Sequence, residues 1–114
     1  MEVFRLEELL SRLERLTPEI SFHEAVSRPT FKAGLIAFSP GGSADPKQIT
    51  HPDKDVLCYV LRGRGRLRAD GRLTPLLPGM LCHVPAQAPH DFVAIKEELL
   101  LFYVLIEAPP AERV

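Results

Sequence analysis

The sequence predicts an all-β protein in which about eight short strands close into a barrel behind one N-terminal amphipathic helix. After Pro18, apolar segments rich in Val, Ile, Phe and Leu alternate with Pro and Gly at short, regular intervals. No second stretch with helical spacing follows, and many strands without further helices indicate a sandwich or a closed barrel. The 114 residues are enough to bury one core, so we expect a single domain.

The helix is predicted within the first segment, residues 1–18. Its apolar positions recur at helical spacing, at Leu6, Leu9, Leu10, Leu13 and Leu16. Glu8 and Arg12 lie four residues apart on the outer side, and Pro18 ends the pattern. We expect the leucine stripe to pack on the barrel or against a second copy, because a membrane surface would favour a more basic polar face.

The barrel is predicted over residues 19–107. Its candidate strands are 20–26, 31–38, 56–62, 66–69, 72–76, 80–84, 90–95 and 99–107. Tight turns are expected at 63–65 and at Asp70-Gly71, and the second is a strong hairpin signal, so consecutive strands should be antiparallel. Residues 39–50 form a long Gly- and Pro-containing loop of the kind that often carries function. Residues 108–114 are predicted to be a C-terminal tail.

The composition excludes several classes of partner. Fourteen basic and fifteen acidic residues give a net charge of −1, so no global field attracts nucleic acid or an anionic membrane. No apolar run approaches the roughly 18 residues of a membrane span, and the charged first segment does not resemble a signal peptide, which predicts a cytoplasmic protein. The absence of Asn and the 11 Pro are typical of thermophilic proteins, although a GC-rich genome alone would also favour Arg and Pro over Asn and Lys.

The two cysteines are predicted to be reduced thiols of the core. Cys58 and Cys82 lie inside apolar stretches and lack the CxxC spacing of a redox or zinc motif. A disulfide between them is the alternative.

Two histidines stand where strands begin. His51 precedes an apolar strand, with Asp53 beside it, and His90 starts a later strand with Asp91 beside it. We expect the two imidazoles to face each other inside one pocket. The alternative is a pair of polar groups at the barrel mouth, hydrogen-bonded to Asp53, Asp91 or water.

These segments resemble the two short motifs of the cupin superfamily of small β-barrels. The first family motif reads H-x-H-x(3 or 4)-E-x(6)-G. When Gly63 is matched to its last glycine, His51 falls at the second histidine, Ile49 at the first and Val56 at the glutamate.

The second family motif reads G-x(5)-P-x-G-x(2)-H-x(3)-N. Gly79, Pro85 and His90 match it in spacing, whereas Gln87 replaces the second glycine and Ala94 the asparagine. The resemblance spans residues 30–107. It implies a cupin-type double-stranded β-helix, or jelly-roll barrel, and a homodimer.

The resemblance also implies a metal site that this sequence fills only in part. Metal-binding cupins use three histidines and a glutamate to hold a divalent ion such as Fe, Mn, Ni or Zn, and only His51 and His90 remain here. Two neutral nitrogens are a weak site, because catalytic ions usually have three protein ligands. Asp53, Cys58 and His83, in that order, are the weaker candidates for a further ligand.

The predicted substrate pocket is apolar. Alternation along the strand after His51 places Val56, Cys58 and Val60 on one face, together with Phe92, and turns Asp55 outward.

Three functions remain open. The first is a small-molecule-binding cupin with a degenerate metal site. The second is a metal-dependent enzyme of the dioxygenase or isomerase type, in which His51, His90 and a carboxylate such as Asp53 hold the ion. The third is a non-catalytic sensor or interaction module, in which the leucine helix and the arginines of residues 62–68 contact a partner. The expected partners are a small ligand and a second copy of the chain, and neither nucleic acid nor a membrane.

Overall fold

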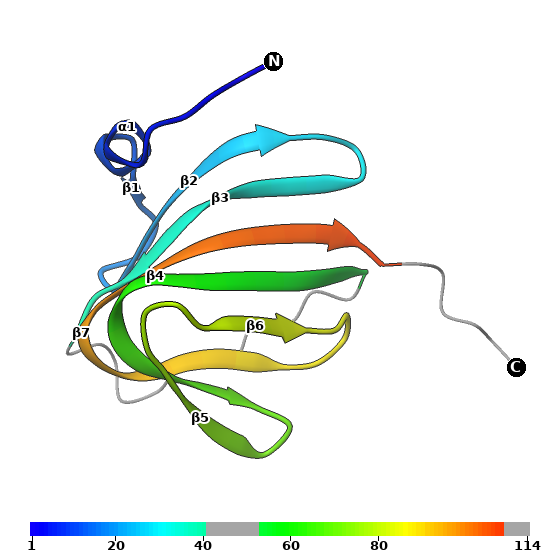
Figure 1. Cartoon of the computed structure of the whole chain (residues 1–114). Helices are drawn as coiled ribbons and strands as arrows, with labels where there is room; N and C mark the ends of the chain where they lie inside the picture. The colour runs from blue at the N-terminus through cyan, green and yellow to red at the C-terminus, as the bar shows by residue number, and fades with distance from the viewer. Residues whose placement is uncertain (41–52, 109–114) are drawn as a thin grey trace, which may run out of the picture.

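The computed structural model describes residues 1–40 and 53–108, which are mostly strands. One short helix, α1 (Leu6–Ser11), precedes them (Figure 1). The strands are β1 (Glu14–Arg15), β2 (Ile20–Ser27), β3 (Phe31–Phe38), β4 (Lys54–Ala69), β5 (Arg72–Leu76), β6 (Leu81–Val84) and β7 (His90–Glu107). The predicted all-β class with one N-terminal helix is confirmed.

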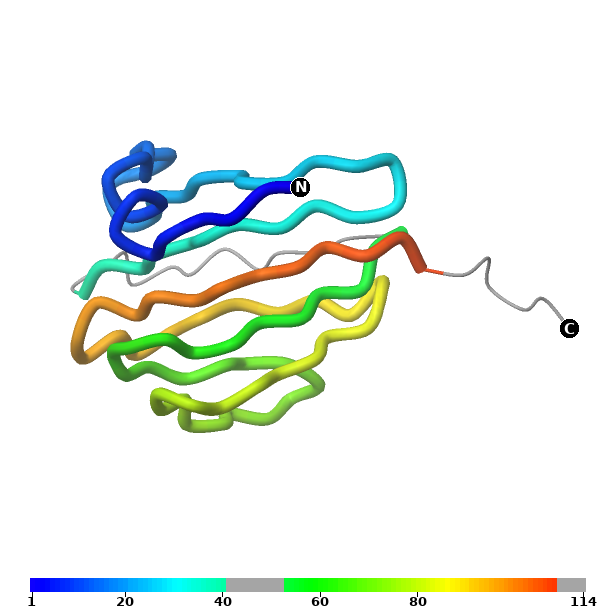
Figure 2. Tube along the Cα trace, turned by 45° about the horizontal axis from the view of Figure 1, so that its top comes forward, coloured from blue at the N-terminus to red at the C-terminus, as the bar shows by residue number. Residues whose placement is uncertain are grey.

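The strands pair antiparallel in the order β1-β2-β3-β7-β4-β5, and β6 pairs with the first half of β4. β4 and β7 are 16 and 18 residues long and pair from Lys54 opposite Glu107 to Ala69 opposite His90. Both strands bend sharply midway, as Figures 1 and 2 show, so the two halves of this pair belong to two facing walls. Register shifts between Val60 and Arg66 mark the bend, as β-bulges do.

This bend lies where the sequence predicted a tight turn. The prediction of a turn at 63–65 is wrong, because β4 continues through these residues. Gly63 adopts a φ of +93° there, and a Cβ at this position would overlap the carbonyl oxygen of Glu98 on β7. The predicted Asp70-Gly71 turn between β4 and β5 is confirmed, with φ values of 53° and 69° that are typical of a hairpin turn.

The helix covers part of the outer surface. Leu9 is buried against Leu35, Ala37 and Leu100, which lie on β3 and β7. The helix ends at Ser11, earlier than the leucine spacing suggests, because Glu14–Arg15 pairs with β2 as a short strand. No helix in the described ranges is long and apolar enough to span a bilayer.

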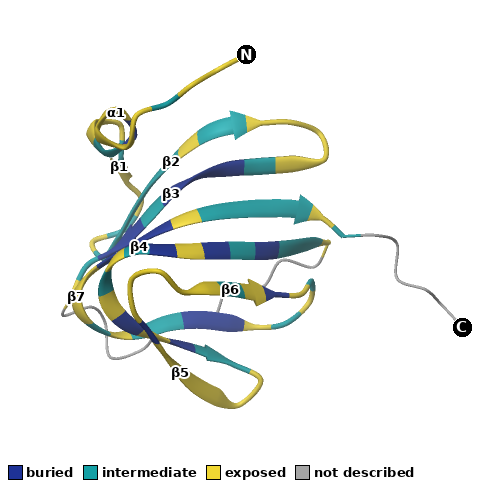
Figure 3. Cartoon of the chain, viewed as in Figure 1, coloured by how far each residue is buried: buried dark blue, intermediate teal, exposed yellow. Residues whose placement is uncertain are grey.

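The main core fills the space between the two walls. It consists of Phe38, Val56, Cys58, Val60, Leu67, Leu76, Val84, Leu99 and Leu101. Buried and exposed residues alternate along much of β4, which Figure 3 shows as colour bands. The apolar run in β7 is explained by two cores, since Leu99 and Leu101 enter the barrel while Leu100 packs under α1.

Candidate functional site

His90 lies at the start of β7 and is 2% exposed. Its Nδ1 lies 3.1 Å from the carbonyl oxygen of Ala88, and its ring meets that of Phe92 edge to face at 6.1 Å. When Nδ1 donates to this carbonyl, the lone pair is on Nε2, which is the tautomer of a ligand-binding histidine. His51 lies outside the described residues, so the facing of the two imidazoles stays a prediction.

The weaker ligand candidates do not gather around His90. Asp53 has a side chain 75% exposed, with its Oδ2 3.9 Å from the Nζ of Lys54. His83 is on the outer surface, where its Nε2 lies 3.5 Å from the Oδ2 of Asp55. Across residues 1–40 and 53–108, no three His, Cys, Asp or Glu side chains come together as a metal site.

The residues predicted to line the pocket all contribute to the main core. Val56, Cys58 and Val60 are 5%, 4% and 0% exposed. Phe92 is partly buried, and its ring centroid lies 4.8 Å from that of Phe38. This part of the inner surface is therefore apolar and tightly packed.

A row of polar residues crosses the inner surface next to Val56, and sequence reasoning missed it. The strand registers join Glu24 to Gly34, Gly34 to Tyr103, Tyr103 to Cys58 and Cys58 to Cys82. The row thus takes one residue from each of β2, β3, β7, β4 and β6. Since the phenol and both thiols pack on the main core, the row faces the barrel interior.

The β2 end of this row carries complementary charges. The Nζ of Lys32 lies 3.9 Å from the Oε1 of Glu24, and both side chains are partly exposed although they point to the inner face. Burial, and then the negative charge of Glu24, raise the pKa of Tyr103, which keeps its phenol protonated. The barrel is therefore open to water here, and its wall offers a carboxylate, an ammonium and a phenol donor.

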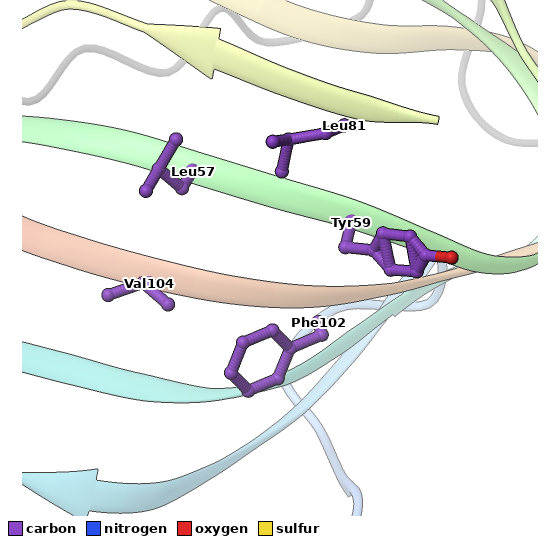
Figure 4. Close-up of a pocket in the computed structure, with 5 residues that line it drawn as sticks. All are labelled: Leu57, Tyr59, Leu81, Phe102 and Val104. Carbon is purple, nitrogen blue, oxygen red and sulfur yellow. The ribbon is translucent and has the colours of Figure 1, made fainter. Parts of the chain in front are cut away.

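A second candidate surface lies on the outside of the same wall. Its apolar side chains surround a shallow hollow of about 300 Å³ (Figure 4). The residues that line the hollow are Leu57, Tyr59, Leu81, Phe102 and Val104. We call these five residues the outer apolar face. Leu81 is 68% exposed, and Tyr59 and Phe102 are each 40% exposed. Apolar side chains exposed together in this way are often part of an interaction surface.

Comparisons with known proteins agree with the motifs. The sequence model of the cupin domain family matches residues 34–106. An uncharacterized protein of Streptomyces coelicolor is 27% identical over 110 residues, which cover 96% of this chain and 98% of that protein. The structure of TT1209 from Thermus thermophilus has a TM-score of 0.76 at 27% identity, covering 96% of this chain and 100% of that one.

A predicted oxalate decarboxylase from Thermotoga maritima has a TM-score of 0.79 at 18% identity, covering 94% of this chain and 100% of that one. At this identity the likeness shows the fold alone. Together these matches confirm the predicted jelly-roll barrel, while the same fold is known to carry many different activities.

Proposed function

This chain belongs to the cupin family, and we propose that it is a small-molecule-binding member whose metal site is degenerate. The observation that carries the proposal is the environment of Val56, which occupies the position of the motif glutamate. Val56 is 5% exposed in the main core, and its neighbours across the sheet are Leu105 and Val84. None of these three side chains has an atom that binds a metal.

The donor set does not fit the family's resident metal. Two imidazoles, from His51 and His90, would leave a divalent ion one protein ligand short of an ordinary catalytic site. Asp53, which the alternative of a metal-dependent enzyme requires, is exposed and lies beside Lys54. The proposed ligand binding therefore does not depend on a bound metal.

The polar row and Lys32, which lies beside its Glu24 end, support a polar ligand. Lys32 supplies a positive charge, Glu24 accepts hydrogen bonds, and Tyr103 donates one from a protonated phenol. These groups stand on the inner surface at a place that water reaches. We propose a ligand that carries hydroxyl groups and one anionic group, bound at the water-accessible end of the barrel beside these groups.

Restoring the missing carboxylate tests the degenerate site. Val56→Glu is expected to raise the affinity for Zn²⁺ or Mn²⁺ by about tenfold to a hundredfold, because it adds a third ligand to His51 and His90. Isothermal titration calorimetry measures the change. Val56→Gln has the same size without the charge and should show no gain. His90→Ala, added to Val56→Glu, should remove the gain.

Two outcomes would contradict this proposal. One is wild-type protein that keeps one divalent ion per chain through dialysis against a chelator. The other is unchanged affinity in a folded Val56→Glu variant, which would mean that Val56 is not at the motif glutamate. Should the buried charge lower stability, the thermal melt with and without metal gives the same affinity through its shift.

We further propose that a second copy of the chain covers the outer apolar face. A two-fold axis through this face would place each hollow against its own copy, which is the usual geometry of a homodimer. Asp55 and His83 border the face and supply the polar rim that such interfaces have. The exposed Leu81 would then be buried.

Charging this face is expected to dissociate the dimer. Leu81→Glu places a carboxylate in the apolar contact, so the mass measured by sedimentation equilibrium should fall from that of two chains to that of one. Leu73→Glu is the matched control, because Leu73 is 53% exposed on β5 and lies outside the face. A monomeric wild type, or equal dissociation by both variants, would reject the proposal.

The cysteines support a reducing compartment. Cys58 and Cys82 are free thiols. We propose that the protein is cytoplasmic, where free thiols are kept reduced.

A further inference from the structure

Two sulfur atoms lie together in the wall of the barrel. Cys58 on β4 and Cys82 on β6 are directly opposite in the sheet, and both pack on the main core. The thiol of Cys82 donates to the carbonyl oxygen of Cys58 at 3.6 Å. The groups proposed above to bind the ligand are those of Glu24, Lys32 and Tyr103, and the two thiols have no role in it.

The register of the strands sets the distance between these side chains. The amide of Val60 donates to the carbonyl oxygen of Met80 at 2.9 Å, and this bond sets which positions along β4 and β6 are hydrogen-bonded. Cys58 and Cys82 lie two residues further along both strands, and they therefore form a hydrogen-bonded pair. The Cβ atoms of such pairs are about 5.5 Å apart, whereas a disulfide prefers about 3.8 Å. The two sulfurs are better suited to holding one atom between them than to bonding each other.

We propose that Cys58 and Cys82 form a two-sulfur site for a soft monovalent cation, with Cu(I) as the reference ion. Sulfur ligands favour such ions over hard ones. The neighbours of the pair along β4 and β6 include Val56, Val60 and Val84, which are buried and offer no oxygen or nitrogen side-chain ligands.

Among the described residues, the donors at this pair are too few for zinc. A structural Zn²⁺ ion needs four ligands, and in the described part of the chain no third His, Cys, Asp or Glu joins this pair. Tyr103, opposite Cys58 on β7, does not supply an anionic oxygen because burial and Glu24 raise its pKa. The site therefore suits an ion that binds only two ligands.

Binding is a substitution without a redox change. Two S–Cu bonds form, the two S–H bonds break, and both protons go to water while copper stays Cu(I). Cys82 is partly exposed and gives the ion its way in. The hydrogen bond between the thiols lowers the pKa of Cys82 and, together with burial, raises the pKa of Cys58, so we expect the more exposed Cys82 to bind first.

The test is an anaerobic titration of the full chain with Cu(I) in competition with a coloured Cu(I) chelator. We expect one ion per chain, and a loss of affinity of about a hundredfold or more in Cys58→Ser and in Cys82→Ser, since one sulfur is then left. X-ray absorption at the copper edge should show two sulfur neighbours. His90→Ala and Met80→Leu are the controls and should bind Cu(I) as the wild type does.

Several results would overturn the proposal. The first is that the wild type shows no saturable binding of Cu(I). The others are full Cu(I) affinity in either serine variant, loss of Cu(I) affinity in His90→Ala, and binding of Zn²⁺ as tight as that of Cu(I). Formation of an intramolecular disulfide under mild oxidation would refute the spacing argument. Thermal melts establish that each variant is folded, and Cys58→Ala replaces Cys58→Ser if the buried hydroxyl prevents folding. Because Val56→Glu and this titration use different residues, failure of one leaves the other standing.

Discussion

Replacing Gly63 with alanine should lower the free energy of unfolding by about 3 kcal/mol, because two separate costs meet at this residue. Its φ of +93° is unfavourable for any residue with a Cβ. A Cβ there would also overlap the backbone of Glu98 and lie 2.8 Å from the Cα of Leu99. These are backbone atoms, so β4 and β7 would have to separate at the bend that joins the two walls.

Gly79→Ala separates the two costs. Gly79 has nearly the same φ, +91°, but nothing lies within 4 Å of where its Cβ would be. Its replacement should therefore cost only the conformational part, about 1 kcal/mol. Urea denaturation followed by circular dichroism measures both variants. Equal losses of unfolding free energy in Gly63→Ala and Gly79→Ala would mean that the close approach of β7 to Gly63 adds no cost.

Gly63 and the Asp70-Gly71 turn show which parts of the fold could be predicted from the sequence. The alternation of apolar residues and the Asp70-Gly71 hairpin were sufficient for the fold class and for the limits of β3 and β5. The bend at Gly63 was mistaken for a turn, because a glycine in a bulge and a glycine in a hairpin leave the same local signal. Only the pairing of β4 with β7 distinguishes them, and that pairing joins residues far apart in sequence.

The two residues that depart from the second motif both have left-handed backbone conformations. Gln87 stands where the family has glycine and has a φ of 71°, while Ala94 stands where it has asparagine and has a φ of 51°. Glycine and asparagine are the residues that most readily adopt these left-handed conformations. Gln87 and Ala94 therefore hold conformations that the motif's own glycine and asparagine would favour more.

The sequence predicted which residues of one strand share a face of the sheet, but not which residues of different strands lie side by side. Alternation correctly placed Val56, Cys58 and Val60 on one face. The sequence contained no comparable clue that Glu24, Tyr103 and the two cysteines form one row, since this depends on four separate strand registers. Residues separated by tens of positions are brought together only by the order of strands in the sheet.

Replacing Arg68 with alanine should lower the melting temperature by an amount on the order of 10 °C. Arg62, Arg64 and Arg66 are exposed on β4, whereas Arg68 is partly buried. Its Nε and Nη2 donate to the two carboxylate oxygens of Asp91 at 3.0 and 2.6 Å. The side chain of Asp91 is only 3% exposed, so without the guanidinium its charge would be buried without this partner.

Two further variants distinguish loss of the partner from loss of packing. Arg68→Met combined with Asp91→Leu removes both charges while it keeps apolar bulk, and it should melt closer to the wild type than Arg68→Ala does. Arg64→Ala is the surface control, because the ion pair of Arg64 with Glu97 is exposed at both ends and contributes little. Differential scanning calorimetry measures all three. Equal melting of the Arg68 and Arg64 variants would show that the pair does not stabilise the start of β7, where Asp91 directly follows His90.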